Sequence, residues 1–438
     1  MSIRLAQPML RAIAVVALLK PVCGQLQTAV TESTSLEAAQ KRQAIAEVAK
    51  LLRTRYAVAS TAEKAATLLE RQLAAGAYDS ISTAGPFARA IAADLRKITG
   101  DRHLDFGVVT PPDTAAPTPD AQRSARLAVI RRGNYGLPRA EILPGNVGYL
   151  EVRRFQSPDL GGDTIAAAMQ FLANADALII DLRNCHGGSP YAMPIFAGYL
   201  VASPVHLFDM EFRGDNYTDH YWTSAWLPGK RLAGVPLYIL TSPYTFSGAE
   251  ALAYRFQILK RATIIGETTA GGANAGGLLN VAPFFCIWMP MGRPIDPDTS
   301  GNWEGTGVIP DIKTAARDAL DIAHAEALKA LRAKARTEGE KRSVDWALDR
   351  AAARLNPPTL RQQDYDRLAG SYGEGRVWFE GGQLRFQRGT DTPYLLTAIS
   401  ATVFTTDTDE PIRLEFGERD VLIFSDEDGV VHRLRRYR

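Results

Sequence analysis

Residues Leu237–Gly266 read LYILTSPYTFSGAEALAYRFQILKRATIIG, and they combine two short apolar runs with a polar turn and a helical pattern. The runs Leu237–Leu240 and Thr263–Gly266 predict buried strands, because their apolar residues are continuous and flanked by turn signals. Between them, Ala249–Leu259 predicts a helix. A strand, a helix and a second strand in this order predict a parallel sheet whose faces are covered by helices.

The same alternation extends toward the N-terminus. Val147–Val152 and Ala177–Leu182 predict strands, and Thr164–Ala173 and Tyr191–Leu200 predict helices. In parallel sheets of this kind, ligands bind at the carboxyl ends of the strands. Three polar, glycine-bearing turns follow predicted strands and are candidates for a functional site: Arg183–Ser189, Thr241–Gly248 and Glu267–Gly277.

The regions on either side of this core have different sequence patterns. Residues 36–99 carry apolar residues at three- and four-residue steps, which predicts three amphipathic helices. Pro111–Pro119 is rich in Pro, Ala and Thr and predicts a loop or linker. Thr314–Thr337 predicts a long helix, and residues 338–362 are charged and then proline-bearing. Tyr372–Arg435 contains short alternating runs separated by glycine turns, which predicts a small antiparallel β domain.

These patterns divide the chain into four parts. We expect a signal peptide over 1–24, an N-terminal helical domain over 36–105, an α/β core over 106–340, and a linker with a C-terminal β domain over 341–438.

The N-terminus is typical of an export signal. Arg4 and Arg11 supply positive charge, Ala12–Leu19 is a short apolar run, and Val22–Gly24 offers small residues for cleavage before Gln25. Lys20 and Pro21 interrupt the pattern, so an apolar leader without that role is the alternative. The signal predicts a periplasmic or secreted protein.

Composition excludes several classes of protein. The net charge of the 438 residues is only +2, so no strong field recruits nucleic acid, and we expect a solvated tail at Arg433–Arg438. Outside the leader, no stretch reaches the roughly 20 apolar residues of a membrane span, so we expect no transmembrane anchor. If Cys23 leaves with the signal, Cys185 and Cys286 make neither a disulfide framework nor a metal cluster. No pattern indicates an oligomeric state.

Ser247 stands between a predicted strand and a predicted helix, and two interpretations are open. Ser-x-x-Glu before an apolar run is the capping-box pattern, and the chain has a second copy at Ser60–Glu63. Alternatively, the helix N-terminus favours the negative charge that develops when a serine attacks a carbonyl. A serine hydroxyl needs a base for that role.

Three further stretches could complete a hydrolytic site. His103 could be the base, although a lone histidine is often structural or exposed. The glycine turn at Gly187–Gly188 could aim backbone N–H groups at an oxyanion, or it could be an ordinary turn. Glu304 could orient a histidine, or it could lie in a surface turn.

Five ordered blocks resemble the C-terminal processing, or tail-specific, serine peptidase family. The blocks are GYLEVRRF (148–155), ALIIDLRNCHGG (177–188), TSPYTFSGAEALAY (241–254), ATIIGETTAGG (262–272) and WEGTGVIPDI (303–312). The match covers roughly residues 145–313, and the helices before it resemble the N-terminal domain of the branch that includes the interphotoreceptor retinoid-binding protein. The resemblance implies a ClpP/crotonase-like core, with Ser247 as nucleophile and the backbone of Gly248, Gly187 and Gly188 as oxyanion hole.

The chain departs from part of that family. The peptidases with a Ser–Lys dyad have lysine where this chain has Gly272, and too little sequence lies between the helical region and Val147 for their PDZ domain. The chain is more similar to the tricorn-type branch, which uses serine, histidine and glutamate, and His103 and Glu304 match by position. Tricorn-type sites have a serine before the histidine, whereas this chain has Arg102.

The resemblance, together with the expected signal peptide, implies an exported serine endopeptidase, a hydrolase active in the proteolysis of peptides or unfolded proteins. Ser247 attacks the carbonyl, His103 is general base and then general acid, and Glu304 orients His103; no metal or cofactor is implied. The main alternative is a non-catalytic protein that binds an apolar, retinoid-like ligand on the same fold, because a fold does not determine a function. A third interpretation makes the C-terminal β domain a partner-docking module.

Overall fold

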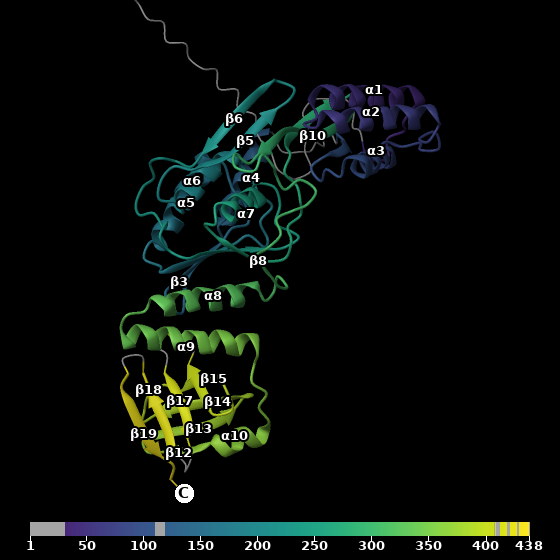
Figure 1. The fold of residues 1–438 in the computed structure, drawn as a ribbon. Coiled ribbons are helices and arrows are strands. Elements are labelled where there is room, and N and C mark those ends of the chain that lie inside the picture. The colour runs from purple at the N-terminus through teal and green to yellow at the C-terminus, as the bar shows by residue number, and fades with distance from the viewer. Residues whose placement is uncertain are drawn as a thin grey trace, which may run out of the picture.

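The computed structural model describes residues 31–109, 119–406, 408, 412–417, 421–426 and 429–437. The predicted signal peptide and almost all of the predicted Pro111–Pro119 linker lie outside these residues. Figure 1 shows the N-terminal helices at one end of the molecule, the α/β core in the middle and the C-terminal sheet at the other end.

The N-terminal part consists of the three expected helices, α1 (Ala38–Arg55), α2 (Ala59–Ala74) and α3 (Ala84–Thr99). Their buried faces share one apolar cluster with Phe285 and Ile287 of a strand in the core. The helical part is therefore packed onto the core through a common set of side chains.

The main sheet of the core has six strands in the order β11-β8-β7-β4-β3-β2. Its strands are β2 (Arg139–Leu143), β3 (Val147–Glu151), β4 (Ala177–Asp181), β7 (Leu237–Thr241), β8 (Thr263–Gly266) and β11 (Ile312–Lys313). All neighbours are parallel except β2 and β3, which are antiparallel. Every residue of β4 and β7 is buried, which explains why their sequences are continuous apolar runs.

Helices cover both faces of this sheet. On one face, Leu178 and Ile180 of β4 pack in a cluster with α5 (Pro158–Phe171), α6 (Met193–Gly198) and α7 (Gly248–Ile258). On the other face, Ala177 and Ile179 pack in a cluster with α8 and α9, whose bounds are Ala319–Lys334 and Glu338–Leu355. Residue 341, the predicted start of the linker, lies inside α9.

A second sheet in the core has no counterpart among the sequence-predicted strands. It contains β1 (Asp105–Val108), β5 (His206–Phe212), β6 (Tyr217–Trp222), β9 (Ala275–Val281) and β10 (Phe285–Ile295), all paired antiparallel. The long strand β10 contains Pro290, Gly292 and Pro294, and its register shifts against β9 at this point. Proline and glycine inside a strand argue against a strand assignment, so the sequence pattern of β10 does not predict a strand.

The C-terminal part is an antiparallel sheet, as expected, and its eight strands follow one another in sequence order. Its strands are β12 (Gly370–Tyr372), β13 (Gly375–Glu380), β14 (Gln383–Arg388), β15 (Tyr394–Ala398), β16 (Val403–Thr406), β17 (Arg413–Gly417), β18 (Val421–Ser425) and β19 (Val431–Arg435).

The remaining helices are α4 (Pro119–Arg132), η1 (Asn134–Gly136), η2 (Pro190–Ala192) and α10 (Gln362–Leu368). Figure 1 shows α8 and α9 as a layer between the core and this sheet, and Arg413 of β17 reaches Asp349 of α9 (2.5 Å). Among the helices of the described residues, none is both long enough and apolar enough to cross a membrane.

Candidate active site

Ser247 lies in the tight turn between β7 and α7. Its backbone adopts φ 56° and ψ −123°, a conformation that side-chain-bearing residues rarely adopt. Such a residue costs about 1–3 kcal/mol and persists only when its surroundings hold it in place. The turn therefore holds Ser247 at the carboxyl edge of the main sheet, where a parallel sheet binds its ligands.

Glu250 is the group that holds this turn. Its buried carboxylate accepts hydrogen bonds from the N–H of Ser247 (2.8 Å) and from the N–H groups of Gly271 (2.6 Å) and Gly272 (2.9 Å). The Thr269 hydroxyl donates to it at 2.5 Å. Burial raises the pKa of Glu250, and these hydrogen bonds oppose that rise. The capping-box and nucleophile interpretations are thus compatible, since the Glu250 half of the box fixes the backbone of Ser247.

The Gly187–Gly188 turn packs directly against Ser247. A Cβ atom at Gly187, which has φ 78°, would lie 2.5 Å from the nitrogen of Gly248 and 2.9 Å from the Cβ atom of Ser247. A Cβ atom at Gly188 would overlap the carbonyl oxygen of Phe155. Only glycine fits at either position, so the structure brings the three predicted oxyanion-hole glycines together.

The backbone donors of these glycines differ in their partners. Burial raises the pKa of the Cys185 thiol to about 12, and the backbone N–H of Gly187 opposes that rise. Within the described ranges, the N–H groups of Gly188 and Gly248 have no hydrogen-bond acceptor, and a Cβ atom at Gly248 would lie 3.4 Å from the nitrogen of Gly188. Gly188 and Gly248 therefore offer the adjacent donors, and Gly187 shapes the turn.

His103 lies between α3 and β1, and its ring contacts Phe246, the residue before Ser247. The ring centroids are 4.3 Å apart, with an angle of 32° between the planes. Asp101 accepts the backbone N–H of His103 at 2.9 Å, while Nδ1 of the ring is buried without a partner. Burial lowers the pKa of His103 to about 4, against the opposing charge of Asp101. At neutral pH the imidazole is therefore uncharged, which is the form a general base requires.

Glu304 lies in the loop before β11 and is tied to the Gly272 segment. Its Oε2 accepts the N–H groups of Ala273 (2.6 Å) and Asn274 (3.0 Å), whereas Oε1 is buried without a partner. Burial, followed by the charge of Asp101, raises the pKa of Glu304 to about 7.

Asp101 connects these groups through a buried network. Its Oδ2 accepts hydrogen bonds from the hydroxyl of Tyr56 and from the side-chain amide of Asn274, each at 3.0 Å. Sequence reasoning missed Asp101 and Asn274, although Asp101 stands only two residues before His103.

The three predicted catalytic side chains share a neighbourhood without direct contacts. Across the part of the chain that the structure describes, no ion pair within 4.0 Å joins His103 to Glu304, and no hydrogen bond joins His103 to the Ser247 hydroxyl. Three buried polar atoms in this region have no partner: His103 Nδ1, Asn274 Oδ1 and Glu304 Oε1. Each buried donor or acceptor that lacks a hydrogen-bond partner costs about 1–3 kcal/mol of stability. This cost favours side-chain rotations that bring such donors and acceptors together.

Two parts of the chain match profiles of one family. Residues 146–314 match peptidase family S41, and residues 30–134 match the N-terminal domain of peptidase S41 in eukaryotic IRBP. Together these matches span more than half of the chain. The chain belongs to peptidase family S41. It is a serine-type peptidase by that membership, and its mixed α/β fold with N-terminal helices and an antiparallel C-terminal sheet is the one expected.

Solved structures with a related fold share little sequence with this S41 chain. The photosystem II D1 C-terminal processing protease is 16% identical with a TM-score of 0.41, over 63% of this chain and 93% of that chain. A putative peptidase from Parabacteroides merdae ATCC 43184 is 14% identical with a TM-score of 0.47, over 70% of this chain and 100% of that chain. The tricorn protease is 13% identical with a TM-score of 0.41, over 65% of this chain and 35% of that chain. The family assignment rests on the two profile matches.

Phe246 leaves room only for glycine at position 272 of this S41 chain. A Cβ atom at Gly272, the position of the lysine in Ser–Lys enzymes, would overlap the ring of Phe246. The same ring lies against His103. Phe246 therefore excludes a side chain at position 272 and supports the histidine, a role that the sequence alone did not reveal.

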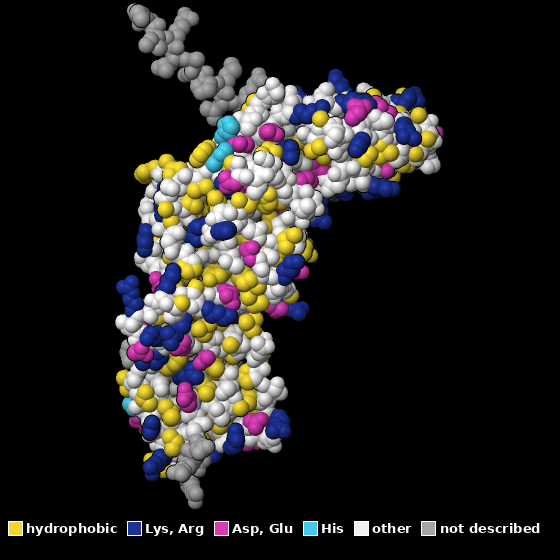
Figure 2. Space-filling view, in the orientation of Figure 1, with side chains coloured by type: hydrophobic (Ala, Val, Ile, Leu, Met, Phe, Trp, Pro, Cys, Tyr) yellow, Lys and Arg dark blue, Asp and Glu magenta, His cyan; other side chains and the backbone are white. Residues whose placement is uncertain are grey.

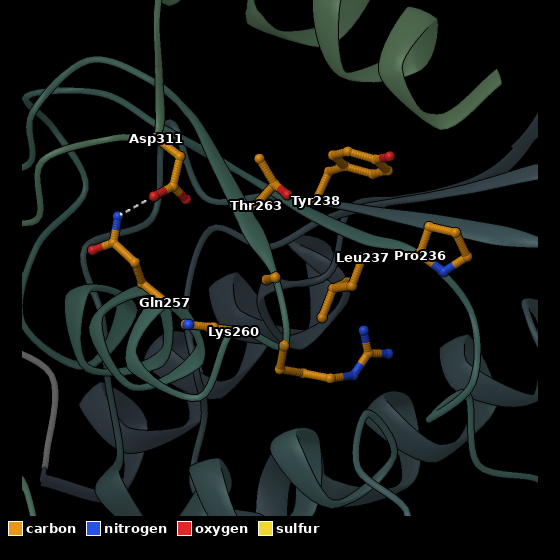
Figure 3. Close-up of a pocket in the computed structure, with 9 residues that line it drawn as sticks. Pro236, Leu237, Tyr238, Gln257, Lys260, Thr263 and Asp311 are labelled. Atoms are coloured by element: carbon orange, nitrogen blue, oxygen red, sulfur yellow. Dashed lines mark hydrogen bonds between the residues drawn. The ribbon is translucent and has the colours of Figure 1, made fainter. Parts of the chain in front are cut away.

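A surface pocket of about 360 Å³ lies away from this site. Figure 3 shows its lining, which includes Leu237 and Thr263, the first residues of β7 and β8, and Gln257 bonded to Asp311 at 2.8 Å. Ser247 follows the opposite, carboxyl end of β7. The pocket is therefore separate from the candidate active site.

Proposed function

We propose that this S41 peptidase is an exported endopeptidase that cleaves peptides or unfolded proteins through Ser247, His103 and Glu304. The observation that carries the proposal is the strained turn of Ser247, which stands beside two unpaired backbone donors, Gly188 and Gly248. Membership of a peptidase family implies peptide or protein substrates.

In the proposed reaction, Oγ of Ser247 attacks the carbonyl carbon of the scissile peptide bond, and its proton passes to His103. The N–H groups of Gly188 and Gly248 stabilise the oxyanion, a type of interaction that is worth about 2.7–4 kcal/mol per donor in other serine peptidases. His103 then protonates the leaving amine, and the acyl-enzyme forms. Water, activated by His103, releases the acid product and regenerates Ser247.

Glu304 acts on the other side of the imidazole in this proposal. Pairing Glu304 Oε1 with the N–H at Nδ1 of His103 satisfies two buried atoms that otherwise lack partners. It also stabilises the imidazolium that forms when Ser247 is deprotonated. A rotation of the His103 or Glu304 side chain on substrate binding would bring about this pairing, since catalytic hydrogen bonds often tighten in the substrate complex.

A fluorophosphonate probe tests the nucleophile. Purified protein should be labelled once, at Ser247, and should hydrolyse an unfolded protein substrate. Labelling elsewhere, or none in protein that hydrolyses the substrate, would refute the assignment of Ser247.

A second candidate function is the binding of an apolar ligand without catalysis. The match of residues 30–134 to a domain named for eukaryotic IRBP favours it. The two functions differ in one measurement, because a binder retains retinoid-like ligands and leaves peptide substrates intact.

Export is the remaining part of the proposal and rests on the sequence of residues 1–24. N-terminal sequencing of protein from the native host should begin near Gln25, in a periplasmic or secreted fraction. A mature protein that begins at Met1 or Ser2 in the cytosol would exclude it.

A further inference from the structure

The hairpin formed by β5 and β6 carries a cluster of two histidines and an aspartate. His206 and Asp209 lie on β5, and His220 lies on β6. Figure 2 shows histidine side chains, in cyan, beside acidic ones on the surface over this hairpin. The hairpin forms one edge of the second sheet, with β6 as the outer strand.

A bulge brings the three side chains to one face. Residues three apart on a regular strand point to opposite faces, but the register between β5 and β6 shifts between His206 and Phe208. The extra residue of such a bulge re-aims the side chains that follow it. His220 stands directly opposite Asp209 in the register, so all three groups converge.

The convergence has the dimensions of a metal site. His206 Nε2 and His220 Nδ1 lie 2.7 Å and 2.6 Å from the same oxygen, Oδ1 of Asp209. The three atoms all lie within 4.8 Å of one another. In tetrahedral zinc sites with bonds of about 2.0–2.2 Å, neighbouring ligand atoms stand about 3.3–3.5 Å apart. Each histidine nitrogen thus needs to move less than about 1 Å from Asp209 to admit the ion.

Neighbouring residues hold His206, Asp209 is partly buried, and His220 is accessible. The ring of His206 stacks on Trp222, with the ring centroids 4.5 Å apart and an angle of 7° between the planes. The backbone carbonyl of His206 accepts a hydrogen bond from Nε of Arg255 at 2.9 Å. His206 and Asp209 expose 20% and 25% of their side chains, whereas His220 exposes 62%. An ion can therefore reach a partly preorganised pair and complete its shell with His220 and a water.

We propose that His206, Asp209 and His220 form a binding site for one Zn²⁺ ion, which joins β5 to β6. Two imidazoles and a carboxylate are a ligand set suited to zinc, with a fourth position open to water. The ion replaces the two hydrogen bonds to Asp209 with three coordinate bonds. It thereby fixes the outer strand of the sheet. The site is independent of the proposed peptidase function.

Calorimetric titration of the full, metal-stripped protein with ZnCl₂ tests the proposal. We expect one Zn²⁺ per chain and a melting temperature that rises with Zn²⁺ concentration, because an ion that binds only the folded state stabilises it. His220→Ala and Asp209→Asn should each weaken binding by more than the roughly 10–100-fold that loss of an outer-shell partner costs. His220 is mostly exposed, so its variant should keep the circular dichroism spectrum of the parent.

Two variants are matched controls. Asp219→Asn changes an acidic residue next to His220, on the opposite face of β6, and His432→Ala removes a histidine of β19 in the C-terminal sheet. Both should bind Zn²⁺ like the parent, and Co²⁺ should give the visible absorption of a tetrahedral site in the parent and the controls alone. No binding by the parent, or equal binding by the His220, Asp209 and control variants, would overturn the proposal.

Discussion

The ring of Phe246 occupies the space into which a side chain at position 272 would project. Gly272 is buried, its N–H donates to Glu250 at 2.9 Å, and its carbonyl accepts the indole N–H of Trp303 at 3.0 Å. Its backbone is thus fixed on both sides and has no room to retreat. One packing arrangement therefore both excludes a side chain at position 272 and places Phe246 against His103.

Gly272→Ala should destabilise the protein and lower its activity. Overpacking of this kind costs about 1–3 kcal/mol of unfolding free energy, and displacing Phe246 moves the support of His103. Urea unfolding and kcat measure the two effects. Gly162→Ala in α5 is the control, because its Cβ atom would meet no atom within 4 Å; it should be neutral or stabilising. Equal stabilities of the Gly272 variant and the parent would contradict the packing argument.

Ser247→Ala should abolish peptide hydrolysis and labelling by fluorophosphonate, because the variant lacks the hydroxyl of the proposed nucleophile. Ser60→Ala is the matched control, since Ser60 begins the second Ser-x-x-Glu pattern and is exposed. It should retain full activity. Hydrolysis that persists in a folded Ser247→Ala protein at the parental rate would show that another residue is the nucleophile.

Ser247→Gly should be as inactive as Ser247→Ala but more stable than it. Both variants lack the hydroxyl, and only glycine adopts a positive φ without strain. The difference in unfolding free energy should be about 1 kcal/mol or more in favour of glycine, net of its greater entropy when unfolded. Urea unfolding of the pair measures it, and a less stable glycine variant would mean that the turn is relaxed.

The pH dependence of kcat/KM should separate the roles of His103 and Glu304. A base works when neutral, so activity falls as pH drops through the pKa of the His103–Glu304 pair. That acid limb should lie between about 4 and about 7, the values that burial gives His103 and Glu304 respectively. In Glu304→Gln the limb should move to lower pH, because the carboxylate that favours imidazolium is gone, and the rate should fall. An acid limb unchanged by Glu304→Gln would exclude Glu304 as the orienting group.

Glu304→Gln should also alter the pH dependence of stability. The folded-state pKa of Glu304, about 7, is above its ordinary value of 4.5, so the folded state binds more protons between these values. Stability therefore falls as pH rises through this window. Glutamine does not ionise, so the variant does not lose this unfolding free energy. The stability of the variant minus that of the parent should therefore be higher at pH 8 than at pH 5. Thermal unfolding at both pH values checks the sign.

The sequence predicted those features that depend on local pattern. β4 and β7 were recognisable because both faces of each strand are buried and the apolar run is unbroken. Ser247 was recognisable from its place between a strand and a helix, and the family resemblance pointed to His103 and Glu304. These three residues do lie in one neighbourhood, although their roles stay predictions.

Other features depend on contacts that no local pattern encodes. Phe246 and Asp101 act through residues on distant elements, and the direction of a ring is not visible in a sequence. The proposed zinc ligands escaped notice because His206 and Asp209 share a face only through a bulge. The charged helix α9 resembled a linker because just one side of it is apolar.

The paired helices α8 and α9 also determine where this protein can be shortened. Val344, Ala347 and Ala351 of α9 are buried in the cluster that covers one face of the main sheet. A chain that ended at residue 340 would uncover that cluster and would be prone to aggregate. A chain that ended beyond Asn356, in the segment that links α9 to α10, would keep the cluster covered. The peptidase core and the C-terminal sheet should therefore be separated after α9 rather than before it.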